Sequence, residues 1–174
     1  LNYAVETGVG VARAVSCGNS AQQGIADFLE FFGADPETRV ALAYLEGVGD
    51  GARFVEVARR FSARKPLVLV KGGVAVEGQR AAASHTGSLA TDDRVFDGVA
   101  RQLGILRAPS IEEAFEWAAT LATQPLPRGR RTVVFTTAGG WGVLAADACV
   151  AAGLEVVALP EELRTRIDSM VPSR

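Results

Sequence analysis

The sequence predicts an α/β fold: a three-layer, doubly wound parallel sheet followed by the start of a second, similar subdomain. Short runs of β-branched and apolar residues alternate with amphipathic stretches along the chain, which is typical of βαβ units. The run at residues 66–70 is apolar throughout, as expected for a strand that helices cover on both faces. These two observations together favour a parallel sheet between two layers of helices.

The elements of the first subdomain follow one another in a regular order. The predicted strands lie at residues 9–17, 40–45, 66–70 and 104–107. The predicted helices lie at residues 25–32, 50–62, 92–103 and 110–121. Gly33 is a natural helix stop, and Ser110 with Glu113 predicts a capping box. Asp50 and the pair Asp92-Asp93 supply negative charge at the starts of two other helices.

A new cycle begins after residues 125–129, whose sequence Pro-Leu-Pro-Arg-Gly predicts a linker. Strands are expected at 131–136 and 154–159, with a helix from the loop at 138–140 to residue 152 and another from residue 160. The predicted domains are therefore residues 1–124 and a truncated second subdomain at 130–174. The opening residues 1–5 resemble the middle of a helix, so we expect a fragment whose first subdomain lacks its N-terminal strand.

Composition excludes several classes of function. A net charge of −2 provides no basic surface for nucleic acid or for an anionic membrane. No apolar run approaches the roughly 18 residues that a membrane helix needs, so no membrane partner is expected. Cys17 and Cys149 form no Cys-x-x-Cys motif, which favours a reducing, cytoplasmic location. The sequence contains no cluster of metal-ligand residues, and no metal site is expected.

Four loops are predicted at the carboxyl ends of the strands, where open parallel sheets bind their ligands. They comprise residues 16–20, 46–49, 71–73 and 137–142. The Lys-Gly-Gly run at 71–73 is similar to a phosphate cradle but lacks the full spacing of nucleotide-binding loops. Gly139 and Gly140 precede a helix and form a fair anion site, although close strand-to-helix packing explains these glycines equally well.

His85, the only histidine of the chain, has the most specific surroundings. Ser84 and Thr86 supply hydroxyl groups, Gly87 lets the backbone approach an anion, and a predicted helix N-terminus follows. An imidazole in this setting could attack a phosphoryl group and hold it as a covalent intermediate. The alternative is a loop histidine that bonds a backbone carbonyl, and chemistry alone leaves both interpretations open.

Glu46, at the end of the second predicted strand, is the candidate partner of His85. A nucleophilic imidazole needs one free nitrogen, and a carboxylate on the other nitrogen fixes its tautomer and orientation. A solvated glutamate at a strand end is the alternative. We expect the two side chains to lie close together.

Several segments resemble one family of enzymes. Residues 65–73 (KPLVLVKGG) and 81–90 (AAASHTGSLA) are similar to the α-part of ADP-forming acyl-CoA synthetases, which are relatives of succinyl-CoA synthetase. Residues 15–19, 44–47 and 137–143 match in the same order, so the resemblance spans essentially the whole chain. The Ser-His-Thr-Gly run with Tyr-Leu-Glu-Gly upstream is its most specific part.

The resemblance implies flavodoxin-like subdomains and a reversible reaction in three steps. Acyl-CoA and phosphate give an acyl phosphate and CoA, the phosphoryl group moves to a histidine, and ADP then accepts it to give ATP. His85 stands where the family has its phosphohistidine, and Glu46 where a glutamate steadies that histidine. Phosphate or substrate binding is expected from Ser84, Thr86, Gly87, Ser16, Gly18, Asn19, Gly139 and Gly140.

The resemblance also implies ligands and partners. CoA, ATP or ADP and Mg²⁺ would be bound mainly by a CoA-binding domain and by an ATP-grasp domain or β subunit, all outside this chain. None of them is expected on the fragment itself, which we expect to be inactive alone. Gln22 and Gly24 stand where the family usually has acidic residues, so the resemblance does not extend to a polar role there. A homodimer is possible because the truncated sheet leaves apolar edges.

Two other functions remain open from the sequence. Some protein acetyltransferases contain a similar region as a non-catalytic regulatory module. A flavodoxin-like interaction domain without chemistry is a further alternative. A retained histidine and glutamate favour the enzyme, because a sensor needs no nucleophile.

Overall fold

The computed structural model describes residues 2–8, 10–18, 20, 22–75, 77–78 and 92–171. It confirms the α/β class, with parallel strands that alternate with helices. The chain forms two compact units, Leu1–Pro125 and Leu126–Arg174. None of the described helices combines the length and the apolar character needed to cross a membrane.

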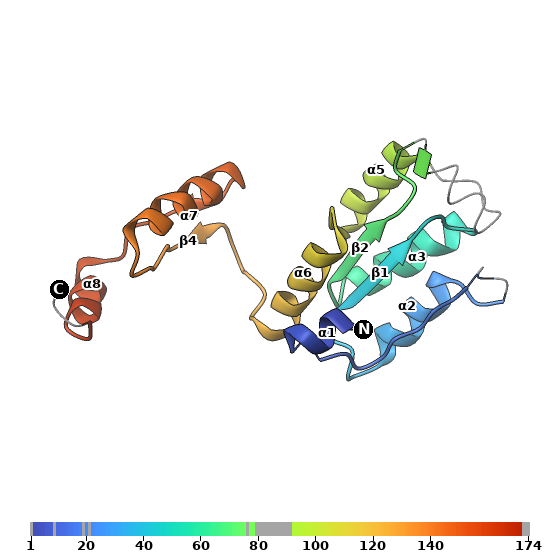
Figure 1. Cartoon of the computed structure of the whole chain (residues 1–174), viewed down its shortest axis with the longest axis horizontal. Coiled ribbons are helices and arrows are strands. Elements are labelled where there is room, and N and C mark those ends of the chain that lie inside the picture. Colours follow the sequence, from blue (N-terminus) through green and yellow to red (C-terminus); the bar gives the residue numbers. More distant parts are fainter. Residues whose placement is uncertain are drawn as a thin grey trace. The chain divides into compact units, whose positions relative to one another are not determined.

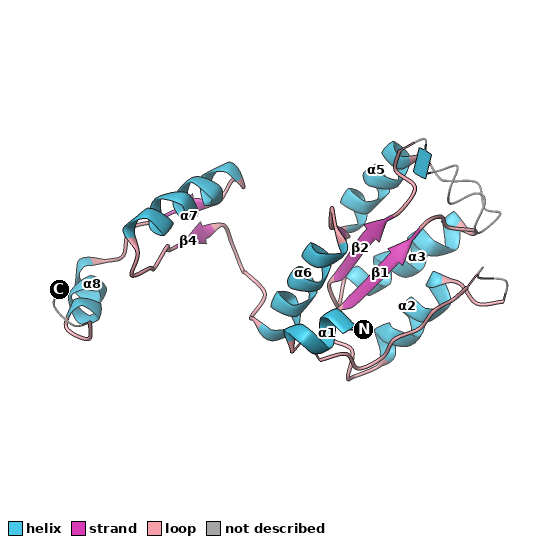
Figure 2. Ribbon diagram, viewed as in Figure 1, coloured by secondary structure: helices cyan, strands magenta, loops and turns pink. Residues whose placement is uncertain are grey.

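The first unit contains a three-stranded parallel sheet between helices (Figures 1 and 2). The strand order is β1-β2-β3, and β2 pairs with both neighbours in parallel. Its elements are α1 (Asn2–Thr7), α2 (Ile25–Ala34), β1 (Ala41–Leu45), α3 (Gly51–Ser62), β2 (Leu67–Lys71), α5 (Asp93–Leu103), β3 (Leu106–Arg107) and α6 (Ile111–Thr123).

The central strand β2 divides the core into two layers. Leu67 and Leu69 belong to a cluster with α2, α3 and α5, whereas Val68 and Val70 pack with α6. All four side chains are buried, because successive side chains of a strand point to opposite faces and both faces are covered here. The apolar run therefore predicted the middle layer correctly.

The predicted helix starts are confirmed by their caps. Asp50 accepts the Arg53 N–H at 2.9 Å, Asp92 accepts the Arg94 N–H at 2.8 Å, and Ser110 accepts the Glu113 N–H at 3.1 Å. Each cap pairs a backbone donor that the helix itself leaves free.

The predicted stop of α2 at Gly33 is wrong by a short distance. The helix continues to Ala34, and the Asp35 N–H closes it by donating to Phe31 O at 3.1 Å. A Cβ at Gly33 would lie 3.5 Å from Phe61 of α3. A Cβ would fit there at ordinary contact distance, so Gly33 is simply a residue of the last turn of α2.

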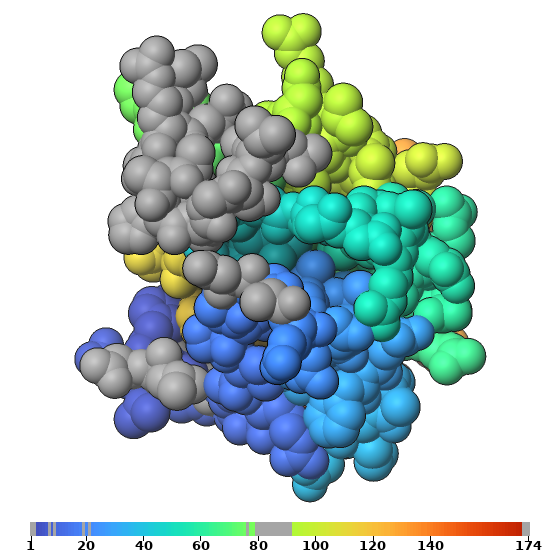
Figure 3. All heavy atoms as spheres, turned by 90° about the vertical axis from the view of Figure 1, so that its right-hand side faces the viewer, coloured from blue at the N-terminus to red at the C-terminus, as the bar shows by residue number. Residues whose placement is uncertain are grey.

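The strand predicted at residues 9–17 is not formed within residues 10–18. This stretch, here called the N-terminal segment, is a loop that does not join the sheet (Figure 2), and its atoms lie next to those of α2 (Figure 3). Its Arg13 forms ion pairs with Asp35 at 3.4 Å and Glu37 at 2.9 Å. Val11 and Val15 remain about half exposed. Alternating apolar residues favour a strand, but the ladder also needs backbone partners.

The second unit repeats the pattern on a smaller scale. Parallel strands β4 (Arg131–Thr132) and β5 (Glu155–Val156) flank α7 (Gly139–Ala151), and α8 (Glu161–Asp168) follows. Both strands are shorter than predicted, because each has only one neighbour and a two-stranded sheet is marginal. Helix α7 exposes apolar residues on several sides, namely Trp141, Val143, Leu144 and Val150.

Candidate functional site

The carboxyl ends of β1 and β2 lie side by side at one edge of the sheet. Leu45 is in register with Lys71, and the Gly72 N–H donates to Leu45 O at 2.8 Å. Glu46 and Gly72 therefore begin adjacent loops. This edge is where parallel sheets place ligands. A polar cluster of three residues, Tyr44, Glu46 and Lys71, occupies it.

Glu46 has one paired and one unpaired carboxylate oxygen. Its Oε1 accepts the hydroxyl of Tyr44 at 3.2 Å. Its Oε2 is buried and meets no hydrogen-bond donor in the part of the chain that the structure describes. Buried polar atoms nearly always have a partner, so Oε2 is an acceptor that the described residues leave open.

Lys71 ends the otherwise apolar strand β2 and has a buried side chain. Its ammonium donates to Glu46 O at 2.7 Å and to Gly72 O at 2.6 Å. Burial lowers the pKa of Lys71, and nearby Asp93 partly offsets this effect. The ammonium thus joins the ends of β1 and β2. Because Lys71 already donates to two carbonyl oxygens, it differs from the free lysine of a phosphate-binding loop.

Arg107, at the end of β3, ties α5 to the same edge. Its guanidinium forms ion pairs with Asp93 at 2.6 Å and Asp97 at 3.4 Å. Both Arg107 and Lys71 place their charged groups 5.9 Å from the ring centre of Phe96, within range of a cation–π contact. These cations organise the sheet edge through contacts within the protein.

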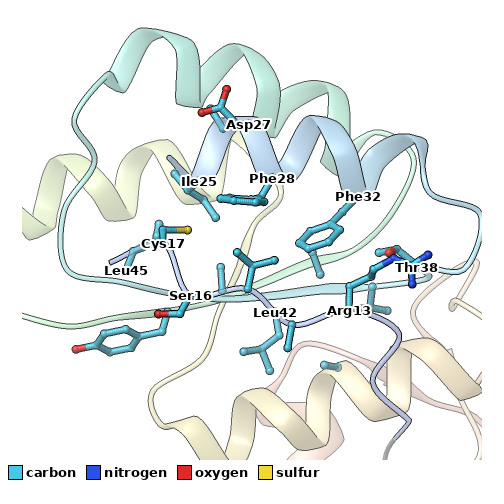
Figure 4. A pocket seen from close by; sticks show the side chains of 18 of the residues that line it. Arg13, Ser16, Cys17, Ile25, Asp27, Phe28, Phe32, Thr38, Leu42 and Leu45 are labelled. Atoms are coloured by element: carbon cyan, nitrogen blue, oxygen red, sulfur yellow. The ribbon is translucent and has the colours of Figure 1, made fainter. Parts of the chain in front are cut away.

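A cavity of about 1500 Å³ adjoins this cluster. It lies among the N-terminal segment, α2, β1 and α6, and Ser16, Gly18 and Glu46 all line it. Figure 4 shows Arg13 and Thr38 at one end, with Ser16 and Cys17 at the other. Burial raises the pKa of the Cys17 thiol, and the charge of Asp27 adds to the effect.

The structure accounts for the predicted site residues in three ways. Ser16, Gly18 and Glu46 share the cavity wall. Gly139 and Gly140 begin α7 in the other unit. Five residues lie outside the described parts of the chain, so their pairings stay predictions: Ser84, His85, Thr86, Gly87 and Asn19. Among the residues that are described, no three His, Cys, Asp or Glu side chains gather to hold a metal ion.

Two members of the cluster were not predicted as site residues. In the sequence, Tyr44 belongs to a motif that matches the family, and Lys71 belongs to a glycine-rich loop with incomplete spacing. A lysine at the last position of an apolar strand is a usable signal, because a buried ammonium needs acceptors close by. The contact of Tyr44 with Gly72 follows from strand register, which the sequence does not display, whereas its bond to Glu46 joins residues two positions apart.

Replacing Lys71 by methionine should loosen the ends of β1 and β2. Two backbone carbonyls would lose a charged donor, which costs about 1–3 kcal/mol of local stability. Hydrogen exchange of peptides that contain Leu45 and Gly72 measures the loss. Lys65→Met is the matched variant, since Lys65 donates to Phe32 O and Asp35 O from a more exposed position, and it should leave exchange at this edge unchanged. Equal exchange in the Lys71 variant and the wild type would contradict this role.

Comparisons with known proteins find similar chains among acyl-CoA ligases. Residues 1–121 match the family model described as the succinyl-CoA ligase-like flavodoxin domain. The α subunit of ADP-forming acetate–CoA ligase I from Pyrococcus furiosus is 44% identical over 99% of this chain and 37% of that protein. The ADP-forming 4-hydroxybutyrate–CoA ligase of Nitrosopumilus maritimus is 34% identical over 95% of this chain and 24% of that protein.

A solved structure is similar along the same length. The dinucleotide-forming acetyl-coenzyme A synthetase 1 of Ca. Korarchaeum cryptofilum, in complex with phosphate and ADP, aligns with a TM-score of 0.90 and 41% identity. The alignment covers 98% of this chain and 37% of that one. The chain thus spans between about a quarter and little more than a third of the length of these relatives.

Proposed function

The chain belongs to the family of succinyl-CoA ligase-like flavodoxin domains, and we propose that it is the phosphohistidine-bearing part of an ADP-forming acyl-CoA synthetase. The whole protein would interconvert acyl-CoA, ADP and phosphate with free acid, CoA and ATP. Relatives named as ADP-forming acetate–CoA and 4-hydroxybutyrate–CoA ligases support this proposal.

The proposed chemistry divides one difficult transfer into simpler steps. Phosphate attacks the thioester carbonyl, the C–S bond breaks, and CoA leaves. A nitrogen of the His85 imidazole then attacks phosphorus of the acyl phosphate, and the P–O bond to the acyl group breaks to release the carboxylate. A terminal oxygen of ADP finally takes the phosphoryl group and restores the imidazole. Glu46 would hold the second nitrogen of the ring.

One observation carries the proposal: the buried Oε2 of Glu46 lacks a partner among the described residues. The N–H of an imidazole is the donor that the family resemblance would place there. The strand-end position of Glu46, beside the loop that starts at Gly72, suits a carboxylate that orients a group on the following loop. The pairing of Glu46 with His85 is part of this proposal.

The remaining ligands are proposed to be held largely by other parts of the enzyme. The nucleotide and its metal would be bound by an ATP-grasp domain or a β subunit, and among the described residues no three His, Cys, Asp or Glu side chains gather. Phosphate and acyl-CoA would meet this chain near Ser16 and Gly18. The second unit would begin another flavodoxin-like subdomain. The free thiols of Cys17 and Cys149 suit a cytoplasmic enzyme.

Phosphorylation of the full-length protein tests the proposal. Incubation with radiolabelled ATP and Mg²⁺ should give a protein-bound label that acid removes and base does not, as expected for a phosphoramidate. Peptide mapping should locate the label between Ala81 and Ala90. Label on another peptide, or no label, would overturn the assignment. A regulatory module would bind acyl-CoA or nucleotide without becoming labelled.

A further inference from the structure

The Tyr44 phenol lies against the carboxylate of Glu46 at the edge of the sheet. Its hydroxyl donates to Oε1 at 3.2 Å, and the two residues share one strand face because they are two positions apart. Oε2, the second oxygen, is buried and has no partner among the described residues. Of the two carboxylate oxygens, Oε1 is therefore hydrogen-bonded and Oε2 is available to another donor.

Gly72 leaves the space in which the phenol of Tyr44 lies. A Cβ at this position would stand 2.9 Å from Cζ of Tyr44 and closer still to its hydroxyl oxygen. Any other side chain would displace the ring, because real Cβ atoms do not approach so closely. The Gly72 N–H is itself bonded to Leu45 O, so the backbone beneath the phenol is part of the sheet.

Glu46 is held a second time through its main chain. Lys71 donates to the Glu46 carbonyl oxygen at 2.7 Å, while Tyr44 holds the side chain. Two fixed points on one residue leave little freedom for the carboxylate to rotate. Burial raises the pKa of Tyr44, and the adjacent Glu46 carboxylate adds to the rise. The phenol accordingly stays protonated and remains a donor near neutral pH.

We infer that Tyr44 is a positioning residue: seated on Gly72, it holds Oε1 of Glu46 and leaves Oε2 to face the reacting group. This inference rests on the proposed function, in which that group is His85. Tyr44 touches neither the phosphoryl group nor CoA in this role. It acts only through the orientation of Glu46.

Single-turnover phosphorylation of the full-length protein tests the inference. Tyr44→Phe should slow formation of the label about 10-fold, the effect of losing one hydrogen bond to a charged group at a partly exposed position. The affinity for ATP should not change. Tyr3→Phe is the control, because it removes the hydroxyl of the other tyrosine of this chain. The Tyr3 ring packs against Phe115, and this variant should leave the rate unchanged.

A second pair of variants separates positioning from general disruption. Gly72→Ala should slow labelling to a similar degree, because the methyl group displaces the phenol. Gly98→Ala is its control, since a Cβ there meets nothing within 4 Å. In a Glu46→Ala background, which removes the acceptor, Tyr44→Phe should have almost no further effect. A full additional 10-fold loss in that background would overturn the inference, because Tyr44 would then act without Glu46.

Titration of the phenol separates failure of the inference from failure of the proposed function. The difference in tyrosinate absorbance between wild type and Tyr44→Phe isolates Tyr44. Glu46→Gln should lower the pKa of Tyr44, and an unchanged pKa would overturn the contact whatever the labelling shows. Absence of label from the wild type overturns the proposed function. Normal labelling of both wild type and Tyr44→Phe overturns only the role of Tyr44.

Discussion

His85→Ala is expected to abolish nucleotide-coupled turnover of the full-length protein. His85 is the only histidine of this chain, so these 174 residues offer no second imidazole that could accept the phosphoryl group in its place. Removal of a covalent nucleophile typically lowers turnover by at least about 10⁴-fold. ATP formation from acyl-CoA, ADP and phosphate is the measurement.

A partial reaction provides the control for His85→Ala. Exchange of labelled CoA into acyl-CoA needs only phosphate and the first step, which precedes transfer to the histidine. The variant should therefore keep this exchange at the wild-type rate while it loses ATP formation. Loss of both activities would point to misfolding, and His85→Asn, of similar size, would then be measured in the same pair of assays. Retained ATP formation in either variant would refute the phosphohistidine.

Glu46→Gln is expected to slow label formation by about 10²- to 10⁴-fold, the range for a positioned acid–base or orienting group. The amide keeps the shape of the side chain and can still accept the Tyr44 hydroxyl. It removes the charge that stabilises a positive imidazole during transfer. The effect should therefore appear in kcat and hardly in KM.

A surface glutamate serves as the control for this variant. Glu56 forms an i,i+4 ion pair with Arg60 at 3.0 Å on α3, and such exposed pairs contribute little. Glu56→Gln should leave the single-turnover rate unchanged. A Glu46 variant that labels as fast as the Glu56 variant would remove Glu46 from the mechanism.

The layers of the first unit follow from local pattern. Residues 66–70 are apolar throughout, and burial on both faces of a strand demands that pattern. Helix starts can be recognised at Asp50, Asp92 and Ser110, because their side chains accept hydrogen bonds from free backbone N–H groups. These signals lie within a few residues of one another and can be recognised without knowledge of the fold.

The failures of sequence reasoning have a common cause. Residues 9–17 carry a strand pattern, yet residues 10–18 form no ladder, because pairing depends on a partner strand and not on the segment alone. Gly33 has the residue type of a helix stop, yet α2 continues to Ala34 and closes on the Asp35 N–H. In both cases the local residue type favours a structure that the surrounding chain does not complete.

By itself, the sequence determined the α/β class, the order of elements from α2 onward and the location of Glu46 at a strand end, because these depend on periodicity and capping over short distances. Only the tertiary structure decided what surrounds Glu46. The pairing of Leu45 with Lys71 brings Gly72 under the Tyr44 phenol and the Lys71 ammonium onto the Glu46 carbonyl. These contacts join separate strands through their register, which no single segment encodes.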